Sequence, residues 1–223
     1  ARQEVGAVRK GGAVVLLSGG MDSATALYWA RRRFRRCTAL IVDYGQRHRR
    51  EIQAARRVAR AAGVRIIEVA CSFPWGGSAL TDRRLSVPSR RSLRGIGRKI
   101  PVTYVPARNA IFLGLAAGCA EALGADAIVI GANALDYSGY PDCRPAFLKA
   151  FERALALGTK RGIGGRRLRI LAPLLRLGKP GIVRLGRRLG APLHLTYSCY
   201  RGGPQPCGRC DACVLREKGF REA

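Results

Sequence analysis

Residues 13–27 read Ala-Val-Val-Leu-Leu-Ser-Gly-Gly-Met-Asp-Ser-Ala-Thr-Ala-Leu, and this stretch decides the fold. Its first five residues are apolar and predict a short buried strand. Ser18-Gly19-Gly20 predicts a turn, because glycine adopts backbone angles that other residues avoid. From Asp22 onward the residues favour a helix, with Asp22 or Ser23 as its N-cap. A strand, a glycine turn and a helix in this order aim free backbone N–H groups at an anion.

The glycine turn lacks the spacing of two common nucleotide-binding loops. No Lys follows the glycines, as a Walker A loop requires, and the pattern G-x-G-x-x-G is absent. Residues 18–23, Ser-Gly-Gly-Met-Asp-Ser, instead resemble the SGGxDS loop of the PP-loop ATP pyrophosphatase superfamily. The resemblance implies that the loop holds the β,γ-phosphates of ATP and that the product is an adenylate. The simpler alternative is an ordinary buried turn between a strand and a helix.

The pattern of apolar residues continues as alternating strands and helices. Further strands are expected at 37–42, 64–70, 125–130 and 169–171, and helices at 22–36, 49–62, 110–123, 145–157 and 179–189. This order predicts an α/β fold: a Rossmann-like parallel sheet with helices on both faces. Ligands of such sheets bind at the carboxyl ends of the strands, so the strand ends at Leu17, Val42 and Ala70 should meet at one crevice.

Two segments interrupt this alternation. Residues 72–101 contain three prolines and four glycines without periodicity, which indicates an irregular insertion that either closes over the crevice as a lid or has no role. Residues 191–223 form a tail that carries four of the eight cysteines. We therefore expect a PP-loop domain over residues 1–190, with the insertion at 72–101, and a small C-terminal metal-binding subdomain over 191–223.

The cysteines of the tail have the spacing of a metal site. Four thiolates at Cys199, Cys207, Cys210 and Cys213 can surround one tetrahedral Zn²⁺ and leave no open position, so a structural zinc site is expected. The C-x2-C-x2-C run also matches part of a ferredoxin ligand set, but the x3-Cys-Pro continuation is absent, which leaves an iron–sulfur cluster or unligated thiols as alternatives.

The composition limits the partners. The 223 residues include 41 Lys and Arg against 14 Asp and Glu, a net charge of +27, and 35 of the cationic residues are Arg. These arginines are scattered and lack interleaved aromatic residues, so we expect non-specific attraction to polyanions without specific nucleic-acid binding. No segment reaches the ~20 apolar residues of a membrane span, and no apolar signal region begins the sequence. Without a disulfide framework, a cytoplasmic location is expected.

Several motifs together resemble one family, that of the 7-cyano-7-deazaguanine synthases (the QueC family). The matching segments span residues 13–220: the SGGxDS loop, Asp43-Tyr-Gly-Gln-Arg-His48, Val105-Pro-Ala-Arg-Asn109, Asp136-Tyr-Ser-Gly-Tyr-Pro-Asp-Cys-Arg144, Pro173-Leu followed by Lys179, Ser198-Cys-Tyr, and Cys207-Gly-x-Cys-Asp-x-Cys-x-Leu-Arg216. One departure is Ala107, where the family pattern usually has Gly, and it matters only if the turn there needs a positive φ.

The resemblance implies a two-step reaction. ATP activates the carboxylate of 7-carboxy-7-deazaguanine as an acyl-adenylate, ammonia displaces AMP to give the amide, and a second ATP activates the amide so that loss of AMP leaves the nitrile. The resemblance also suggests a homodimer. Three alternatives remain: a QueC-like enzyme that joins the adenylated deazaguanine to a protein amine, a tRNA-modifying PP-loop enzyme, and a non-enzymatic basic zinc module that binds nucleic acid.

The same resemblance suggests roles for individual residues. Mg²⁺ would bridge Asp22 to the phosphates, Lys179 would neutralise the leaving pyrophosphate, Arg108 would pair with the substrate carboxylate, and His48 is a candidate base or a structural residue. The residues expected to bind ATP are Leu17, Ser18, Gly19, Gly20, Met21, Asp22, Ser23, Ala24, Asp43, Tyr44 and Gln46. Those expected to bind the deazaguanine are Arg108, Asn109, Asp136, Tyr137, Tyr140, Pro141, Asp142 and Arg144.

Overall fold

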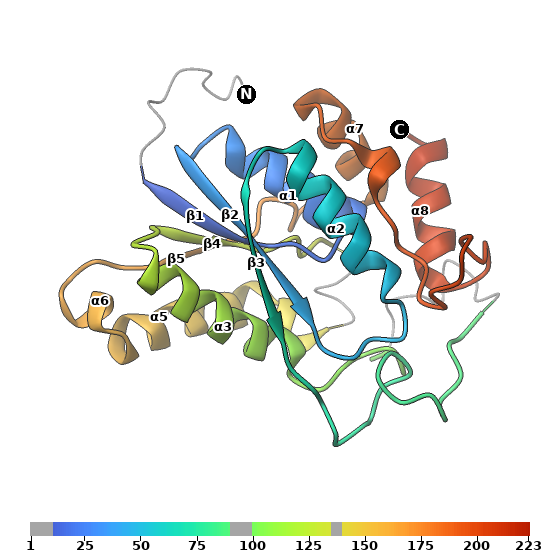
Figure 1. The fold of residues 1–223 in the computed structure, drawn as a ribbon, viewed down its shortest axis with the longest axis horizontal. Coiled ribbons are helices and arrows are strands. Elements are labelled where there is room, and N and C mark those ends of the chain that lie inside the picture. The colour runs from blue at the N-terminus through green and yellow to red at the C-terminus, as the bar shows by residue number, and fades with distance from the viewer. Residues whose placement is uncertain (1–10, 90–99, 135–139) are drawn as a thin grey trace.

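A single parallel sheet organises the chain. The computed structural model describes residues 11–89, 100–134 and 140–223. Its five strands are hydrogen-bonded in the order β3-β2-β1-β4-β5, all parallel (Figure 1). They are β1 (Gly12–Leu16), β2 (Arg36–Asp43), β3 (Arg65–Ala70), β4 (Ala127–Val129) and β5 (Arg169–Leu171). The predicted Rossmann-like sheet is confirmed, with the strand that precedes the glycine turn at its centre.

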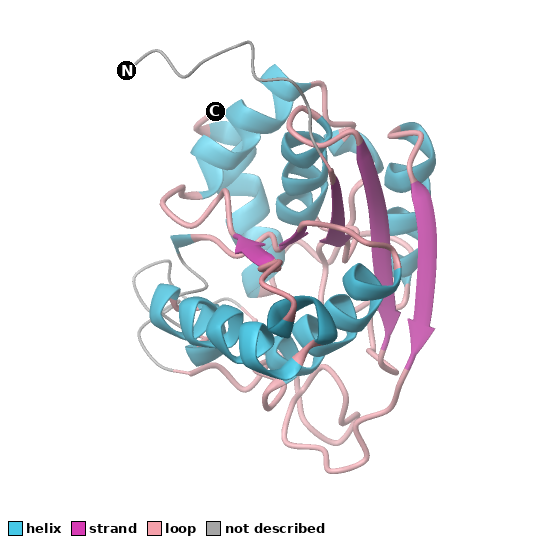
Figure 2. Cartoon of the chain, turned by 90° about the vertical axis from the view of Figure 1, so that its left-hand side faces the viewer, coloured by secondary structure: helices cyan, strands magenta, loops and turns pink. Residues whose placement is uncertain are grey.

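Helices cover both faces of the sheet, as predicted (Figures 1 and 2). On one face lie α1 (Met21–Arg31), α2 (Arg50–Ala61) and α7 (Lys179–Leu189), and on the other lie α3 (Arg108–Ala122) and α5 (Pro145–Gly158). Shorter elements are α6 (Lys160–Ile163) and the 3-10 turns η1 (Pro141–Cys143) and η2 (Leu193–Leu195). The last helix, α8 (Asp211–Arg221), packs against α7.

The central strand, β1, contributes side chains to the hydrophobic cores on both faces of the sheet. All five residues of β1 are buried. Because successive side chains of a strand point to opposite faces, Ala13 and Val15 pack with α1, α2 and α7, whereas Val14 and Leu16 pack with α3 and α5. A strand buried on both faces has no polar positions, which is why the run carries none.

Two features of the helices differ from the predictions. The first helix was expected to reach Arg36, but α1 ends at Arg31. The backbone N–H groups of Arg35 and Arg36 donate to the carbonyl of Gly11, so this part of the chain already follows the sheet. The tail was expected to form a small metal-binding subdomain, and no helix was assigned to it. It contains α8, whose residues from Asp211 include good helix formers behind an acidic first turn.

The predicted irregular insertion has no helix or strand in its described parts, residues 72–89 and 100–101. It is nevertheless anchored, because Ala79 and Leu80 are buried and Arg47 Nη2 donates to the carbonyls of Asp82 and Leu85, both at 3.0 Å. An isolated β-bridge pairs Ser89 with Cys210 of the tail. The insertion therefore contacts both the end of β2 and the cysteine cluster.

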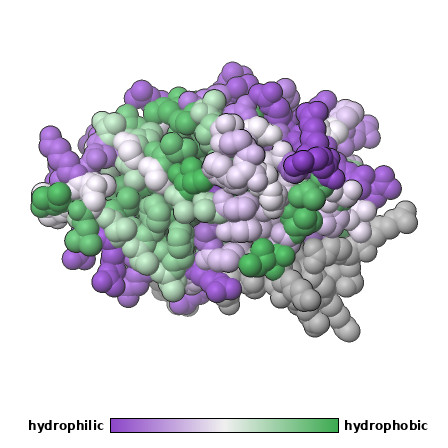
Figure 3. Space-filling model, turned by 90° about the horizontal axis from the view of Figure 1, so that it is seen from below, coloured by the Kyte–Doolittle hydropathy of each residue, from purple (hydrophilic) through white to green (hydrophobic). Residues whose placement is uncertain are grey.

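Apolar residues gather on the outer surface of α3, α5 and α6, beside the exposed cations Lys149, Arg153 and Lys160. Figure 3 shows this side of the molecule, where apolar residues gather over these helices. Leu157 and Ile163 are 80% and 79% exposed, and Ile111, Leu115 and Cys119 of α3 are only partly buried. Across the described residues, no helix combines the length and apolar character that crossing a membrane would need.

The turn before α3 contains the one non-glycine residue with positive φ in the described part of the chain. Ala107, the N-cap of α3, has φ +52° and ψ +20°, the left-handed region that favours glycine. The departure from the family pattern noted at this position therefore has a conformational cost. Since Ala107 also lacks a capping side chain, the start of α3 depends on groups from elsewhere for its hydrogen bonds.

We predict that Ala107→Gly raises the free energy of unfolding by about 1 kcal/mol, because glycine adopts this conformation without the Cβ clash. For a chain of this size the melting temperature would rise by about 2–4 °C. Thermal unfolding monitored by circular dichroism measures the shift. Ala154→Gly, at an exposed position inside α5, is the matched control and should lower stability. A lower melting temperature for Ala107→Gly would contradict the assignment of strain.

Candidate active site

A cavity of about 240 Å³ opens where β1, β2 and β4 end. Most of the residues proposed from the sequence line it: Leu17, Ser18, Gly20, Met21, Asp22, Ser23, Tyr44, Gln46, His48, Arg108, Asn109, Tyr140 and Lys179. They come from segments far apart in the sequence, and the carboxyl ends of the strands bring them together, as expected for this type of sheet.

The turn at residues 18–20 approaches α2 very closely. Gly19 has φ +89°, and a Cβ atom there would overlap the carbonyl oxygen of Glu51 and lie 2.6 Å from Ala55 N. Only glycine fits, so the turn lies directly against the first turn of α2. The hydroxyls of Ser18 and Ser23 share a hydrogen bond of 3.1 Å across the turn, at the start of α1. The result is a small concave surface of hydroxyls and helix N-terminal N–H groups, which suits phosphate oxygens. Ala24, in contrast, is fully buried in the core behind the turn.

Three elements meet at the carboxylate of Asp22. Lys179 Nζ, from the first residue of α7, donates to Asp22 Oδ2 at 2.5 Å, and Asn133 Nδ2 donates to the same oxygen at 3.1 Å. The lysine side chain is only 11% exposed. Asp22 offsets the unfavourable position of this cation at a helix N-terminus. The other oxygen, Asp22 Oδ1, is buried and accepts no hydrogen bond from the described residues, so a hard cation such as Mg²⁺ fits this carboxylate.

The end of β2 is held by a network around Glu51. His48 Nε2 lies 3.0 Å from Glu51 Oε2, and Gln46 Nε2 donates to Glu51 Oε1 at 3.1 Å. Gln46 Oε1 in turn accepts from Tyr44 N at 2.8 Å. The second ring nitrogen of His48, Nδ1, is buried without a hydrogen-bond partner in the described chain. Gln46 thus shapes the loop, whereas His48 still has a nitrogen available for a proton or a ligand.

An aromatic wall lies on the α3 side of the cavity. The Tyr44 ring stacks on Phe73 at 5.6 Å between centroids and meets Phe112 edge-on at 5.4 Å. Arg108 Nη1 donates to Tyr44 Oη at 3.4 Å. Burial raises the pKa of Tyr44, against the opposing effect of the Arg108 charge, so the phenol stays neutral near pH 7. The aromatic rings complement the plane of a flat apolar ligand, and the guanidinium of Arg108 complements an anionic group on that ligand.

Several residues proposed from the sequence lie outside the cavity lining. Asp142 accepts from Asn109 N at 2.9 Å and from Asn109 Nδ2 at 3.2 Å, so it caps α3 in place of Ala107. Asp43 accepts from Gly45 N and from Arg49. The other proposed residues outside the lining are Gly19, Ala24, Pro141 and Arg144, whereas Asp136 and Tyr137 fall outside the described residues.

Several residues that line the cavity or hold its lining received no role in the sequence analysis. Among them are Glu51, Phe112, Asn133, Tyr197, Ser198 and Tyr200. Tyr197, Ser198 and Tyr200 of the tail lie at the cavity because Tyr197 N donates to the carbonyl of Gly19 at 3.0 Å. One feature of the sequence could have identified two of these tail residues. Ser198 and Tyr200 flank Cys199 in the Ser198-Cys-Tyr motif, which supports the family resemblance. Long-range pairing of the tail with the glycine turn was not readable from the sequence.

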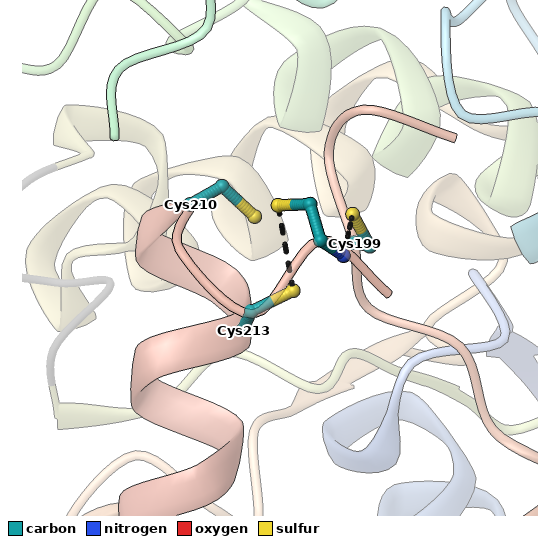
Figure 4. Close-up of side chains that lie close together, drawn as sticks. Cys199, Cys210 and Cys213 are labelled. Carbon is teal, nitrogen blue, oxygen red and sulfur yellow. Dashed lines mark hydrogen bonds between the residues drawn. The ribbon is translucent and has the colours of Figure 1, made fainter. Parts of the chain in front are cut away.

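The four cysteines of the tail converge on one point. Their sulfur atoms all lie within 4.8 Å of one another, and Figure 4 shows Cys199, Cys210 and Cys213 pointing toward a common centre. Tetrahedral Zn–S bonds of about 2.3 Å place sulfurs about 3.8 Å apart, so the cluster fits a structural zinc ion after small adjustments. Although burial raises it, hydrogen bonds from the backbone N–H groups of Arg209 and Cys210 lower the pKa of Cys207 to about 6. The thiolate that a metal requires is therefore favoured at Cys207, whereas burial raises the pKa of Cys210 and of Cys213.

Known proteins resemble this chain over nearly its full length. The profile of the family described as "Queuosine biosynthesis protein QueC" matches residues 12–223. A 7-cyano-7-deazaguanine synthase from Anaeromyxobacter sp. (strain Fw109-5) is 59% identical over 95% of this chain and 92% of the relative. The enzyme of the same name from Trichormus variabilis is 51% identical over 94% of this chain and 93% of the relative.

Among solved structures, the NMN synthetase from Francisella tularensis superposes with a TM-score of 0.51 at 18% identity, covering 90% of this chain and 71% of that one. At this identity the likeness supports the fold alone. The sequence relatives go further, because both the family profile and the curated relatives cover the sheet, the cavity and the cysteine cluster together. The chain belongs to the QueC family of queuosine biosynthesis proteins.

Proposed function

We propose that this chain is a 7-cyano-7-deazaguanine synthase, an ATP-dependent carbon–nitrogen ligase of queuosine biosynthesis. It would convert 7-carboxy-7-deazaguanine and ammonia to the nitrile through adenylated acid and amide intermediates. The observation that carries the proposal is the match of the QueC family and its named enzymes to almost the whole chain. The cavity supports it, because one wall suits phosphates and the facing wall suits a planar acid.

The phosphate side of the cavity would receive ATP. Ser18, Gly20 and Ser23 line it and would bind the β,γ-phosphates, with Gly19 allowing the turn. Mg²⁺, held by Asp22, would neutralise phosphate charge. Lys179 already touches Asp22 and would stabilise the negative charge that grows on the departing pyrophosphate.

The aromatic side would receive the deazaguanine. Arg108 would pair with the substrate carboxylate, and Tyr44 with Tyr140 would contact the ring. Asn109 lines the cavity beside them, held by Asp142. Asp142 would thus support the site through Asn109. Asp136 stays a candidate for the guanidine-like N–H edge of the deazaguanine, and Tyr137 stays a candidate for stacking on its ring. His48 would exchange a proton through Nδ1, since Glu51 occupies its other nitrogen.

The cysteine cluster would hold a structural Zn²⁺, with no reacting group on the metal because four thiolates fill its coordination. Metal analysis of the purified protein tests this assignment. About one zinc per chain is the expected content, and iron in its place would favour the cluster alternative. Cys119→Ser, outside the cluster, is a control that should leave the metal content unchanged.

We propose further that the protein is cytoplasmic and forms a homodimer through the apolar outer face of α3, α5 and α6. In a chain of net charge +27, two copies repel each other, and an interface with few charged residues adds least to this repulsion. Leu157, Ile163 and the exposed side of α3 form an apolar face on which a second copy could bury surface. Sedimentation velocity at two salt concentrations tests the assembly.

The activity itself is tested by incubating the protein with ATP, Mg²⁺, 7-carboxy-7-deazaguanine and ammonium, followed by mass spectrometry. Nitrile with two AMP per product is expected, because the acid and the amide are each activated once. Without ammonium, AMP bound to the acid should accumulate. A mass increase on a protein amine would favour the alternative acceptor. If no AMP and pyrophosphate form with this acid, the proposed function is wrong.

Lys179→Met should lower kcat by about a hundredfold, because a preorganised cation beside the leaving group is lost. The KM for the deazaguanine acid should change little, since that ligand would bind on the Arg108 side. Lys149→Met, on the exposed surface of α5, is the matched control and should keep full activity. Steady-state kinetics with coupled pyrophosphate detection measures both variants. An unchanged kcat for Lys179→Met would exclude the role.

A further inference from the structure

The tail runs beside the glycine turn and brings a hydroxyl to its rim. Tyr197 N donates to the carbonyl of Gly19 at 3.0 Å, which holds residues 197–198 against the turn. The next residue, Ser198, is half-buried and lines the cavity. A Cβ atom at Gly20 would lie 3.9 Å from Ser198 Oγ. Ser198 therefore stands at the same wall as Ser18 and Ser23, although it lies far away in the sequence.

Arg216 of α8 supports Ser198 from behind the wall. Its Nη1 donates to Thr196 Oγ1 at 2.7 Å and makes a longer contact of 3.5 Å with Ser198 Oγ, and its Nη2 donates to the carbonyl of Leu193 at 3.0 Å. The guanidinium also lies over the ring of Phe220, 4.9 Å from its centroid. Within the described chain, these partners include no carboxylate.

A largely buried cation without a carboxylate partner is costly unless an anion lies nearby. Burial lowers the pKa of Arg216, and negative charge at Asp22 and at Cys213 opposes this shift, so Arg216 interacts electrostatically with the start of α1 as well as with the cysteine cluster. Asp22 lies at the start of α1, beside the concave surface that suits phosphate. The positive potential of Arg216 therefore reaches the same place.

The contact between Arg216 and Ser198 also orients the hydroxyl. Because Ser198 Oγ accepts from the guanidinium, its own O–H points away from Arg216 and can donate to another acceptor. Ser198 lines the cavity, so a ligand bound there can supply this acceptor. A hydroxyl whose oxygen faces a cation is a better donor to an anion than one that faces water.

We infer that Ser198 is a further phosphate-binding residue, held by Arg216 as its positioning residue, so that the tail completes the site for the pyrophosphate part of ATP. The inference rests on the proposed function for the identity of the nucleotide. The inference also assigns the cysteine cluster a role in positioning Ser198 and Arg216. Cys199 follows Ser198 directly, and Cys213 precedes Arg216 by one turn of α8, so the cluster fixes the distance between the two residues.

The inference predicts that Ser198→Ala weakens binding of inorganic pyrophosphate with Mg²⁺, and raises the KM for ATP, by about tenfold, because a charge-assisted hydrogen bond is lost. The KM for the deazaguanine acid should stay the same. Arg216→Gln should show the same pattern with a larger effect, and Arg216→Lys should recover part of it. Arg221→Gln, at an exposed position of the same helix, is the matched control and should behave like the parent.

Isothermal titration with pyrophosphate and steady-state kinetics measure these effects, and metal content and melting temperature are recorded for each variant. Unchanged pyrophosphate affinity in Ser198→Ala overturns the inference, even when nitrile formation supports the proposed function. Weakened pyrophosphate binding in a protein that makes no nitrile leaves the inference standing and rejects the proposed substrate instead. Loss of affinity that appears only in variants with lost metal also overturns it, because the effect is then one of folding.

Discussion

The absence of a side chain at Gly19 is the constraint on which the rest of the structure depends. A Cβ atom at this position would overlap the backbone of α2 at Glu51 and Ala55. The same residue offers its carbonyl to Tyr197 of the tail. One residue therefore lets α2 and the tail close on the turn together. Since Glu51 in turn holds His48 and Gln46, the position of the whole β2 end follows from that close approach.

The charge distribution of the cavity follows from this geometry. Asp22 belongs to the first turn of α1, Lys179 of α7 contacts it, and the charge of Arg216 from α8 acts on it. All three charges are partly removed from water. In such surroundings each charge acts more strongly on a neighbour than it would at the surface. In the part of the chain that the structure describes, most of the other arginines are exposed and screened by salt, so they contribute little to this local balance.

The sheet and its parallel topology were predictable because they depend on short patterns: apolar runs, a glycine turn, and the rule that strand ends meet. That rule placed His48 at the crevice, whereas Lys179 was proposed from the family resemblance, and both residues line the cavity. Asp142 lies outside the cavity lining. The side chain of Ala107 cannot accept a hydrogen bond at the start of α3, and the carboxylate of Asp142 accepts one there from Asn109 N. Ser198 and Asn133 could not be assigned from sequence, since their places depend on packing between segments that lie far apart in the chain. The helix α8 was missed because the cysteine spacing dominated the interpretation of the tail.

The contact between Gly19 and Tyr197 has a consequence for the order of events during synthesis. The turn emerges early from the ribosome, whereas Lys179, Ser198 and Arg216 emerge late. Contacts between such distant segments form slowly, because the chain between them must first be ordered. A nascent chain that has folded only β1, α1 and β2 lacks the cations that face the turn. Coordination of metal by the last cysteines would then act as the closing step of maturation, after which the nucleotide site first becomes competent.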